Sequence, residues 1–162
     1  MTGDSRISSF LSRRPFLAAA GLLALATAVL FHRFLSPFTQ QILSVSGEDM
    51  TGQFIWWRQF GFDELKKGHL ALWDPFLFSG APYFGGFQCA LLYPPNWLFM
   101  VLPLPFALNF TIALHGFLGG WFTFLWIKGR GSRSASALLA AFMFMFGAAF
   151  FLHIVPGHLP NL

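Results

Sequence analysis

Two adjacent carboxylates, Glu48 and Asp49, are the residues of this sequence best suited to chemistry. They stand shortly after the first long apolar run, at a place where one of them could act as a general base on a hydroxyl group. The pair could also hold a divalent cation through its oxygens. Both residues could equally be solvated loop acids. The two residues alone leave these three interpretations open, and they name no metal.

Three other polar residues each admit a functional and a structural interpretation. Arg58 could bind a lipid phosphate through paired hydrogen bonds, or lie on a solvated helix face. His158 follows the last apolar run, where it could meet a phosphate or a sugar, or be an ordinary interfacial histidine. His115 lies inside an apolar run, so we expect it to bond a neighbouring helix or face a cavity. The histidines show no metal-binding spacing such as HExxH.

The composition predicts that helices in a membrane position these residues. Hydrophobic residues make up 56% of the 162 residues, charged residues only 10%, and the mean hydropathy is +0.60. Soluble domains are nearer about 25% charged. The net charge of +4 does not indicate nucleic acid, because the basic residues stand at the ends of apolar runs. The single Cys89 cannot form an intramolecular disulfide. We therefore expect an all-α integral membrane protein in contact with lipids.

Three apolar runs have the length of a bilayer crossing. Bulky residues follow the first run, which argues against a cleaved signal peptide. Basic residues before the first run and between the last two predict that both of those segments are cytoplasmic. The predicted order is a cytoplasmic tail (1–14), a transmembrane helix (15–35), an outer loop (36–105), a second helix (106–127), a cytoplasmic turn (128–134), a third helix (135–155) and an outer tail (156–162).

The outer loop is predicted to contain two short interfacial helices. Residues 51–67 have helical spacing of apolar residues, with Thr51 as the expected N-cap and Gly68 as the terminator. The apolar stretch 84–104 contains three prolines, which argue against a further membrane crossing and favour a short helix at about 96–101. The residues between these helices are rich in Gly, Pro and aromatic side chains, which is typical of an ordered loop with a function.

The same loop resembles a known family. The matching features are an acid after the first run, Gln53, the sequence LWDPF at 72–76, FSGAP at 78–82, Gln88 and Tyr93-Pro94. Further matches are Asn109, His115, Gly119-Gly120, GSR at 131–133 and Gly157-His158. From about residue 15 onward the chain resembles the YfhO-type bacterial membrane proteins, which are polytopic and GT-C-like.

This resemblance implies a glycosyltransferase of the bacterial cytoplasmic membrane. Such a protein transfers a sugar from a polyprenyl-phosphate donor to a cell-envelope acceptor on the outer face. It implies catalytic roles for Asp49 and its neighbour Glu48. The implied substrate-binding residues are Arg58, Gln88, Tyr93 and His158.

Members of that family are much longer than this chain. We therefore expect an N-terminal fragment that is inactive without the remaining helices of a longer parent chain. The alternative from another class is a non-enzymatic polytopic membrane protein, such as a transporter segment or an envelope assembly factor.

Overall fold

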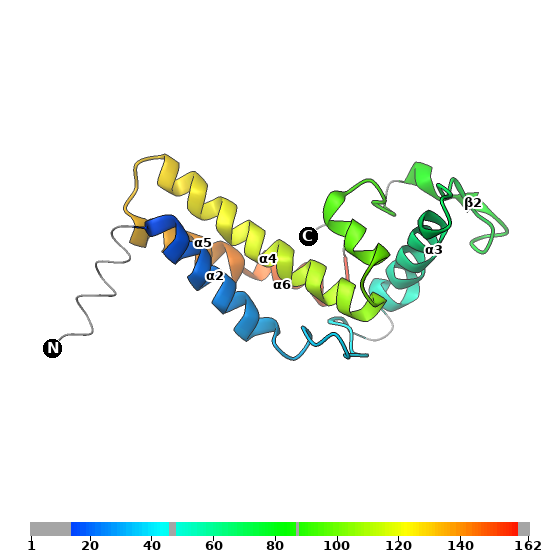
Figure 1. Ribbon diagram of the computed structural model, residues 1–162, viewed down its shortest axis with the longest axis horizontal. Coiled ribbons are helices and arrows are strands. Elements are labelled where there is room, and N and C mark those ends of the chain that lie inside the picture. The colour runs from blue at the N-terminus through cyan, green and yellow to red at the C-terminus, as the bar shows by residue number, and fades with distance from the viewer. Residues whose placement is uncertain (1–13, 46–47, 87, 159–162) are drawn as a thin grey trace. The chain divides into compact units, whose positions relative to one another are not determined.

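A computed structural model describes residues 14–45, 48–86 and 88–158 of the chain. The described residues are mostly helical, with one short two-stranded sheet (Figure 1). The elements in chain order are α2 (Pro15–Phe31), the π-helix η1 (Met50–Phe54), α3 (Ile55–Lys66), β1 (Trp73–Asp74), β2 (Ala81–Pro82), the 3-10 helices η2 (Phe84–Gly86) and η3 (Pro94–Met100), α4 (Leu104–Gly129), α5 (Ser134–Met145) and α6 (Ala148–Ile154). A mostly helical fold with little strand confirms the helical part of the predicted class.

The chain divides into two compact units. The first unit is Met1–His32 with Ala113–Phe150, and the second unit is Arg33–Ile112 with Phe151–Leu162. The division falls inside α4 and α6.

Helix α2 of the first unit is bounded by local chemistry. Pro15 occupies its first turn, where the missing N–H costs no helical hydrogen bond. At the other end the His32 ring lies 2.8 Å from the Val29 carbonyl through Nδ1, which can satisfy one of the last free carbonyl groups. The helix thus ends at Phe31, earlier than the predicted end at Leu35. With 17 residues, it is shorter than the two apolar helical segments Leu104–Gly129 and Ser134–Ile154.

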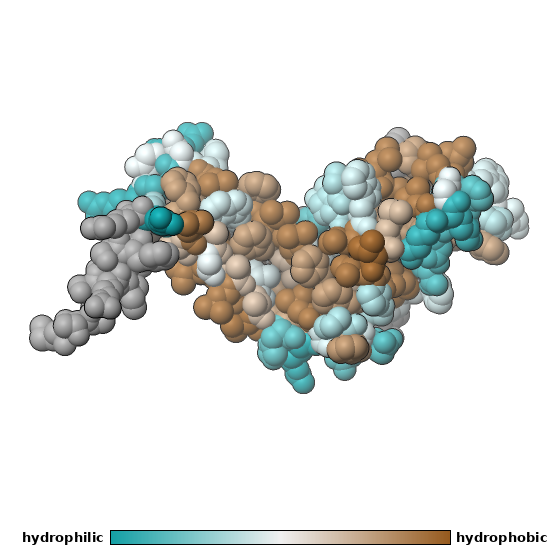
Figure 2. Space-filling model, viewed as in Figure 1, coloured by the Kyte–Doolittle hydropathy of each residue, from teal (hydrophilic) through white to brown (hydrophobic). Residues whose placement is uncertain are grey.

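Small residues allow the helices of the first unit to pack closely. Ala19 and Leu23 of α2, Phe124 of α4, and Ala137, Ala141 and Met145 of α5 form one buried cluster. A Cβ atom added to Gly120 would lie 3.4 Å from side-chain atoms of both Leu23 and Met145, so the glycine suits this close approach. Around the cluster, large apolar side chains such as Leu17, Leu25 and Val29 are exposed. Much of the surface over these helices is correspondingly hydrophobic in Figure 2.

Two helical segments among the described residues are long and apolar enough to cross a membrane. They are Leu104–Gly129 and Ser134–Ile154, which match the predicted second and third helices. The second of these segments was predicted as one continuous helix, but it breaks between α5 and α6 at Phe146 and Gly147. A Cβ atom on Gly147 would lie 3.1 Å from the carbonyl oxygens of Met143 and Phe144, so the tight break favours glycine there.

The second unit is built on α3. Its buried face consists of Arg58, Gly61 and Phe62, and the Phe62 ring packs on Phe99 of η3 with the ring centroids 5.2 Å apart. Gly68 follows the helix with a φ of +83°, which confirms its predicted role as terminator. The predicted N-cap is wrong. Thr51 lies inside η1, whose N-cap is Asp49, and the Thr51 hydroxyl donates to the Glu48 carbonyl at 3.1 Å.

A small hairpin and two 3-10 helices complete the second unit. Strands β1 and β2 pair antiparallel, with Trp73 opposite Pro82 and Asp74 opposite Ala81. Phe78, Ser79 and Gly80 in the connecting turn all have positive φ values. The described residues of the stretch 84–104 form the short helices η2 and η3, and η3 overlaps the short helix predicted at about 96–101.

Candidate functional site

One buried amide holds the segment that leads to the carboxylate pair. Asn109 of α4 is 0% exposed, and its Nδ2 donates to the carbonyls of Phe34 at 3.2 Å and Gln41 at 2.8 Å. Its Oδ1 accepts from the Leu43 N–H at 2.8 Å. Both amide donors are therefore used. Asn109 fixes this part of the second unit in place, a role that the sequence pattern did not reveal.

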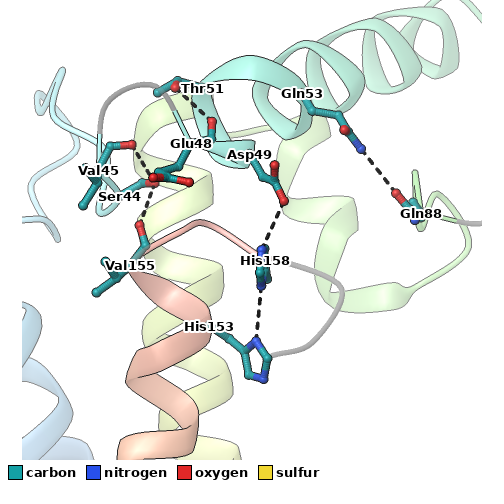
Figure 3. Close-up of polar contacts among 10 residues, drawn as sticks. All are labelled: Ser44, Val45, Glu48, Asp49, Thr51, Gln53, Gln88, His153, Val155 and His158. Atoms are coloured by element: carbon teal, nitrogen blue, oxygen red, sulfur yellow. Dashed lines mark hydrogen bonds and ion pairs between the residues drawn. The ribbon is translucent and has the colours of Figure 1, made fainter.

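The segment after α6 lies against the same region. The Val45 N–H donates to the Val155 carbonyl at 3.0 Å, and the Ser44 hydroxyl donates to the same oxygen at 3.3 Å (Figure 3). Gly157 has a φ of +82°, and a Cβ atom there would lie 2.8 Å from the Met50 nitrogen and 2.9 Å from its Cα. Only glycine fits this close contact of two backbones. The contact brings the next residue, His158, to the start of η1.

Asp49 and His158 form the central pair of the candidate site. His158 Nε2 lies 3.1 Å from Asp49 Oδ2, and the two side chains are 37% and 55% exposed (Figure 3). His158 Nδ1 lies 3.4 Å from Nδ1 of His153, which belongs to α6. The sequence predicted functions for Asp49 and His158 separately. The structure brings them together and adds His153, which the sequence reasoning missed.

The positions of the hydrogens on Asp49, His158 and His153 depend on one another. When neutral His158 donates from Nε2 to the carboxylate, its Nδ1 is an acceptor, so the His153 Nδ1 must carry the donated hydrogen. When His158 becomes protonated, it donates from both ring nitrogens, and His153 must accept. A solvent-accessible carboxylate joined to two imidazoles in this way is able to take up and pass on a proton.

Glu48 lies beside the pair and is exposed. Its backbone carbonyl accepts from the Thr51 N–H at 3.1 Å and the Gly52 N–H at 3.0 Å, so its main chain forms the entry to η1. The structure describes no group of three or more His, Cys, Asp or Glu side chains that could together hold a metal ion. A cation bound by Glu48 and Asp49 stays a prediction from the sequence.

Arg58 is buried and does not lie on a solvated helix face. Its side chain is 3% exposed, and its guanidinium NH1 donates to the Gln88 carbonyl at 3.0 Å and to the Cys89 carbonyl. The guanidinium also lies over the Phe99 ring, 6.0 Å from its centroid. Burial lowers the pKa of Arg58 below its usual value, although an arginine this basic stays charged. The residue ties the loop at 88–89 to α3, and substrate contact stays untested.

The remaining predicted site residues lie in the same unit. Gln88 is exposed, and its Oε1 accepts from Gln53 Nε2 at 3.3 Å. The pair therefore joins η1 to the loop after η2. Tyr93 is 42% exposed directly before η3. Neither residue contacts Asp49 in the interactions just described.

Tyr83 is a further anchor that the sequence did not single out. Its hydroxyl donates to the Trp57 carbonyl, and burial raises its pKa well above the usual value, so it stays a donor at any physiological pH. Its ring lies against Gly61, where an added Cβ would collide with it. The contact fixes the β1–β2 hairpin region on α3.

No family model, no curated protein and no solved structure matches the chain. What can be said of its function therefore rests on the residues and the geometry above.

Proposed function

We propose that this chain is part of a membrane glycosyltransferase that takes a sugar from a polyprenyl-phosphate donor, with Asp49 as the general base. One observation carries the proposal: the carboxylate of Asp49, in the loop after the first apolar helix, lies 3.1 Å from Nε2 of His158, which follows the last one. A general base needs an exposed, oriented carboxylate or imidazole, and this pair supplies both.

The proposed membrane position is supported by the helices. Leu104–Gly129 and Ser134–Ile154 are long and apolar enough to cross a bilayer. The shorter α2 exposes Leu17, Leu25 and Val29 to more than half of their full surface. A helix that is apolar on every side belongs in a core or in a membrane. We propose three crossings, with α2 completed at the membrane surface by its flanking residues.

The proposed sidedness follows from the basic residues. Lys128, Arg130 and Arg133 surround the turn between α4 and α5, and positive residues favour the cytoplasmic side. One crossing away, the Asp49–His158 pair then faces outward. A polyprenyl phosphate holds its sugar at that headgroup level, so the base and the donor meet at one depth.

The reaction proposed at this site balances as a displacement. An acceptor hydroxyl loses its proton to Asp49, assisted by His158. The acceptor oxygen forms a bond to the anomeric carbon while the bond from that carbon to the phosphate oxygen breaks, and the phosphate leaves with the electron pair. His153 can exchange the proton onward through the Nδ1 contact with His158.

The test is sugar transfer in membranes from cells that express the protein in its own genomic reading frame. Asp49→Asn removes the base and keeps the size of the side chain, so transfer should fall by about 100-fold to 10,000-fold. Asp63→Asn is the matched control, because Asp63 lies on the exposed surface of α3, where it pairs with Lys66 at 3.1 Å. This variant should transfer normally.

Three outcomes would contradict the proposal. Normal transfer by Asp49→Asn would remove Asp49 as the base. No transfer by the wild-type protein would favour a non-enzymatic polytopic protein instead. The sidedness is tested with single cysteines at 49 and 130 in a Cys89→Ala background. A cysteine at 49 that reacts only from inside, and one at 130 that reacts only from outside, would contradict the proposed sidedness.

A further inference from the structure

A cleft lies beside the candidate site, between α3 and the loop that carries β1 and β2. It consists of two hollows of about 660 Å³ and about 220 Å³. Trp57, Asp74 and Leu77 line both of them, so the hollows adjoin. The larger volume falls in the range of about 300–1,000 Å³ that is usual for small-molecule sites.

Aromatic side chains form much of the wall of the larger hollow. Trp56, Trp57 and Phe60 come from α3, and Phe76 and Phe78 come from the turn between β1 and β2. The Phe60 and Phe76 rings meet edge to face, with their centroids 6.0 Å apart. Phe78 has a φ of +51° and is 88% exposed, so the turn presents an aromatic side chain at an energetic cost to the backbone.

Polar groups are placed among these rings. The Asp74 side chain is 6% exposed, and one of its oxygens, Oδ1, accepts from the Phe76 N–H at 2.8 Å. Gln53 lines the larger hollow and Gln88 the smaller, and the bond between their amides leaves the Gln53 oxygen and the Gln88 NH₂ group for a ligand. Among the lining residues that the structure describes, there is no Lys, Arg or His.

We propose that this cleft binds a neutral pyranose unit of a saccharide. The faces of aromatic rings are electron-rich and complement the weakly positive C–H groups on the face of a pyranose. Asp74 can accept from hydroxyl groups, and the two glutamine amides can both donate and accept. An anionic ligand would meet the Asp74 carboxylate with no cation to offset it. A lipid chain would leave these polar groups desolvated without partners.

The place of the cleft identifies this saccharide as the acceptor, a step that rests on the proposed function. Asp49 directly precedes η1, and Gln53 comes four residues later, about one helical turn along the same face. On the proposed function, a pyranose held against Gln53 and Trp56 would lie near Asp49 along η1, and we assign it as the acceptor.

The test is binding of neutral methyl glycosides to the purified 162-residue chain in detergent, followed by NMR saturation transfer and by tryptophan fluorescence. The probes are the methyl pyranosides of glucose, galactose and mannose, with glucose 6-phosphate as the anionic comparison. We expect at least one neutral glycoside to bind more tightly than glucose 6-phosphate.

Two matched pairs of variants locate the binding. Asp74→Asn keeps an oxygen for the Phe76 N–H but removes the charge, and should weaken binding about 10-fold to 100-fold, whereas Asp63→Asn should not. Trp56→Ala should abolish detectable binding. Trp97→Ala should leave it unchanged, although Trp97 is similarly exposed and also donates its indole N–H to a backbone carbonyl at 3.0 Å.

The outcomes separate this proposal from the proposed function. Binding is measured without a sugar donor, so it does not require Asp49 to act as a base. If no neutral glycoside binds, or if the 6-phosphate binds more tightly, the saccharide cleft is refuted even where transfer depends on Asp49. If the glycoside binds but no transfer occurs, the cleft stands and the glycosyltransferase assignment fails.

Discussion

Replacing Gly157 by alanine should separate the two halves of the candidate site. Gly157 has a φ of +82°, where a residue with a Cβ pays about 1–2 kcal/mol. The new Cβ would also press on Met50, with the Met50 nitrogen at 2.8 Å and its Cα at 2.9 Å. These are backbone atoms of a residue that is 0% exposed, so no flexible side chain can move aside. Overpacking of this kind costs about 1–3 kcal/mol.

The combined loss for Gly157→Ala should be about 2–5 kcal/mol of unfolding free energy, unless the segment moves away from η1 to relieve it. Either response displaces His158, because it is the next residue. Gly68→Ala is the matched control. Gly68 has a φ of +83° in the same unit, with nothing within 4 Å of the added Cβ, so it should lose only the backbone term of about 1–2 kcal/mol.

Two measurements check this difference. Denaturant titration in detergent, followed by tryptophan fluorescence, gives the unfolding free energies. Carbethoxylation of histidines, located by mass spectrometry, should show His158 reacting faster in Gly157→Ala than in Gly68→Ala, because the Asp49 carboxylate no longer bonds its Nε2. Equal stability and equal His158 reactivity in the two variants would refute the close contact at Met50 and the geometry built on it.

Two further variants test the second unit. Asn109→Leu removes three hydrogen bonds of a fully buried amide and should cost about 3–5 kcal/mol, whereas Asn96→Leu, which loses one side-chain bond to the Ala90 carbonyl, should cost about 1–2 kcal/mol; equal losses in denaturant titration would contradict the anchoring role. The hydrogen bond from Lys67, helped by His69, lowers the pKa of Glu64 below 4.5. Its stabilisation is therefore present above that pH and is lost as the pH falls through the lowered pKa. Glu64→Gln should flatten the acid side of the stability profile, and an unchanged acid slope would count against the ion pair.

Helices and their ends could be predicted where the length of an apolar run or a single residue decides the structure. The apolar run 106–127 lies within α4, and Gly68 ends α3 because a positive φ favours glycine. Proline content kept 84–104 from being taken as a helix. The break at Gly147 could not be predicted in this way, because the segment Ser134–Ile154 is apolar throughout and its composition does not distinguish one helix from two.

The sequence predicted residues that belong to the candidate site, but it did not predict the contacts between them. Asp49 and His158 were each selected as polar residues close to the ends of apolar runs, and the charge pattern placed both on the outer side, but no pattern put their side chains in contact. Arg58 shows the opposite limit. Its spacing is equally suited to a solvated face, whereas the structure turns it inward onto the carbonyls of residues 88 and 89. Helical spacing shows on which side of the helix a residue lies. Whether that side is buried depends on the segment that packs against it.

The contacts that sequence reasoning missed share one physical property. Asn109 reaches back more than sixty residues to bond residues 34, 41 and 43, and Gly157 reaches Met50 over more than a hundred. Such contacts leave no local period, because each depends on one amide or one missing Cβ at a crossing of two segments. The geometry of Asp49 and His158 depends on both of these residues. Asn109 holds the segment before η1, and Gly157, which has no Cβ, allows the backbone that carries His158 to lie against Met50. Substitutions at Asn109 and Gly157 should therefore disturb the site as strongly as changes in the carboxylate itself, although neither residue takes part in the chemistry.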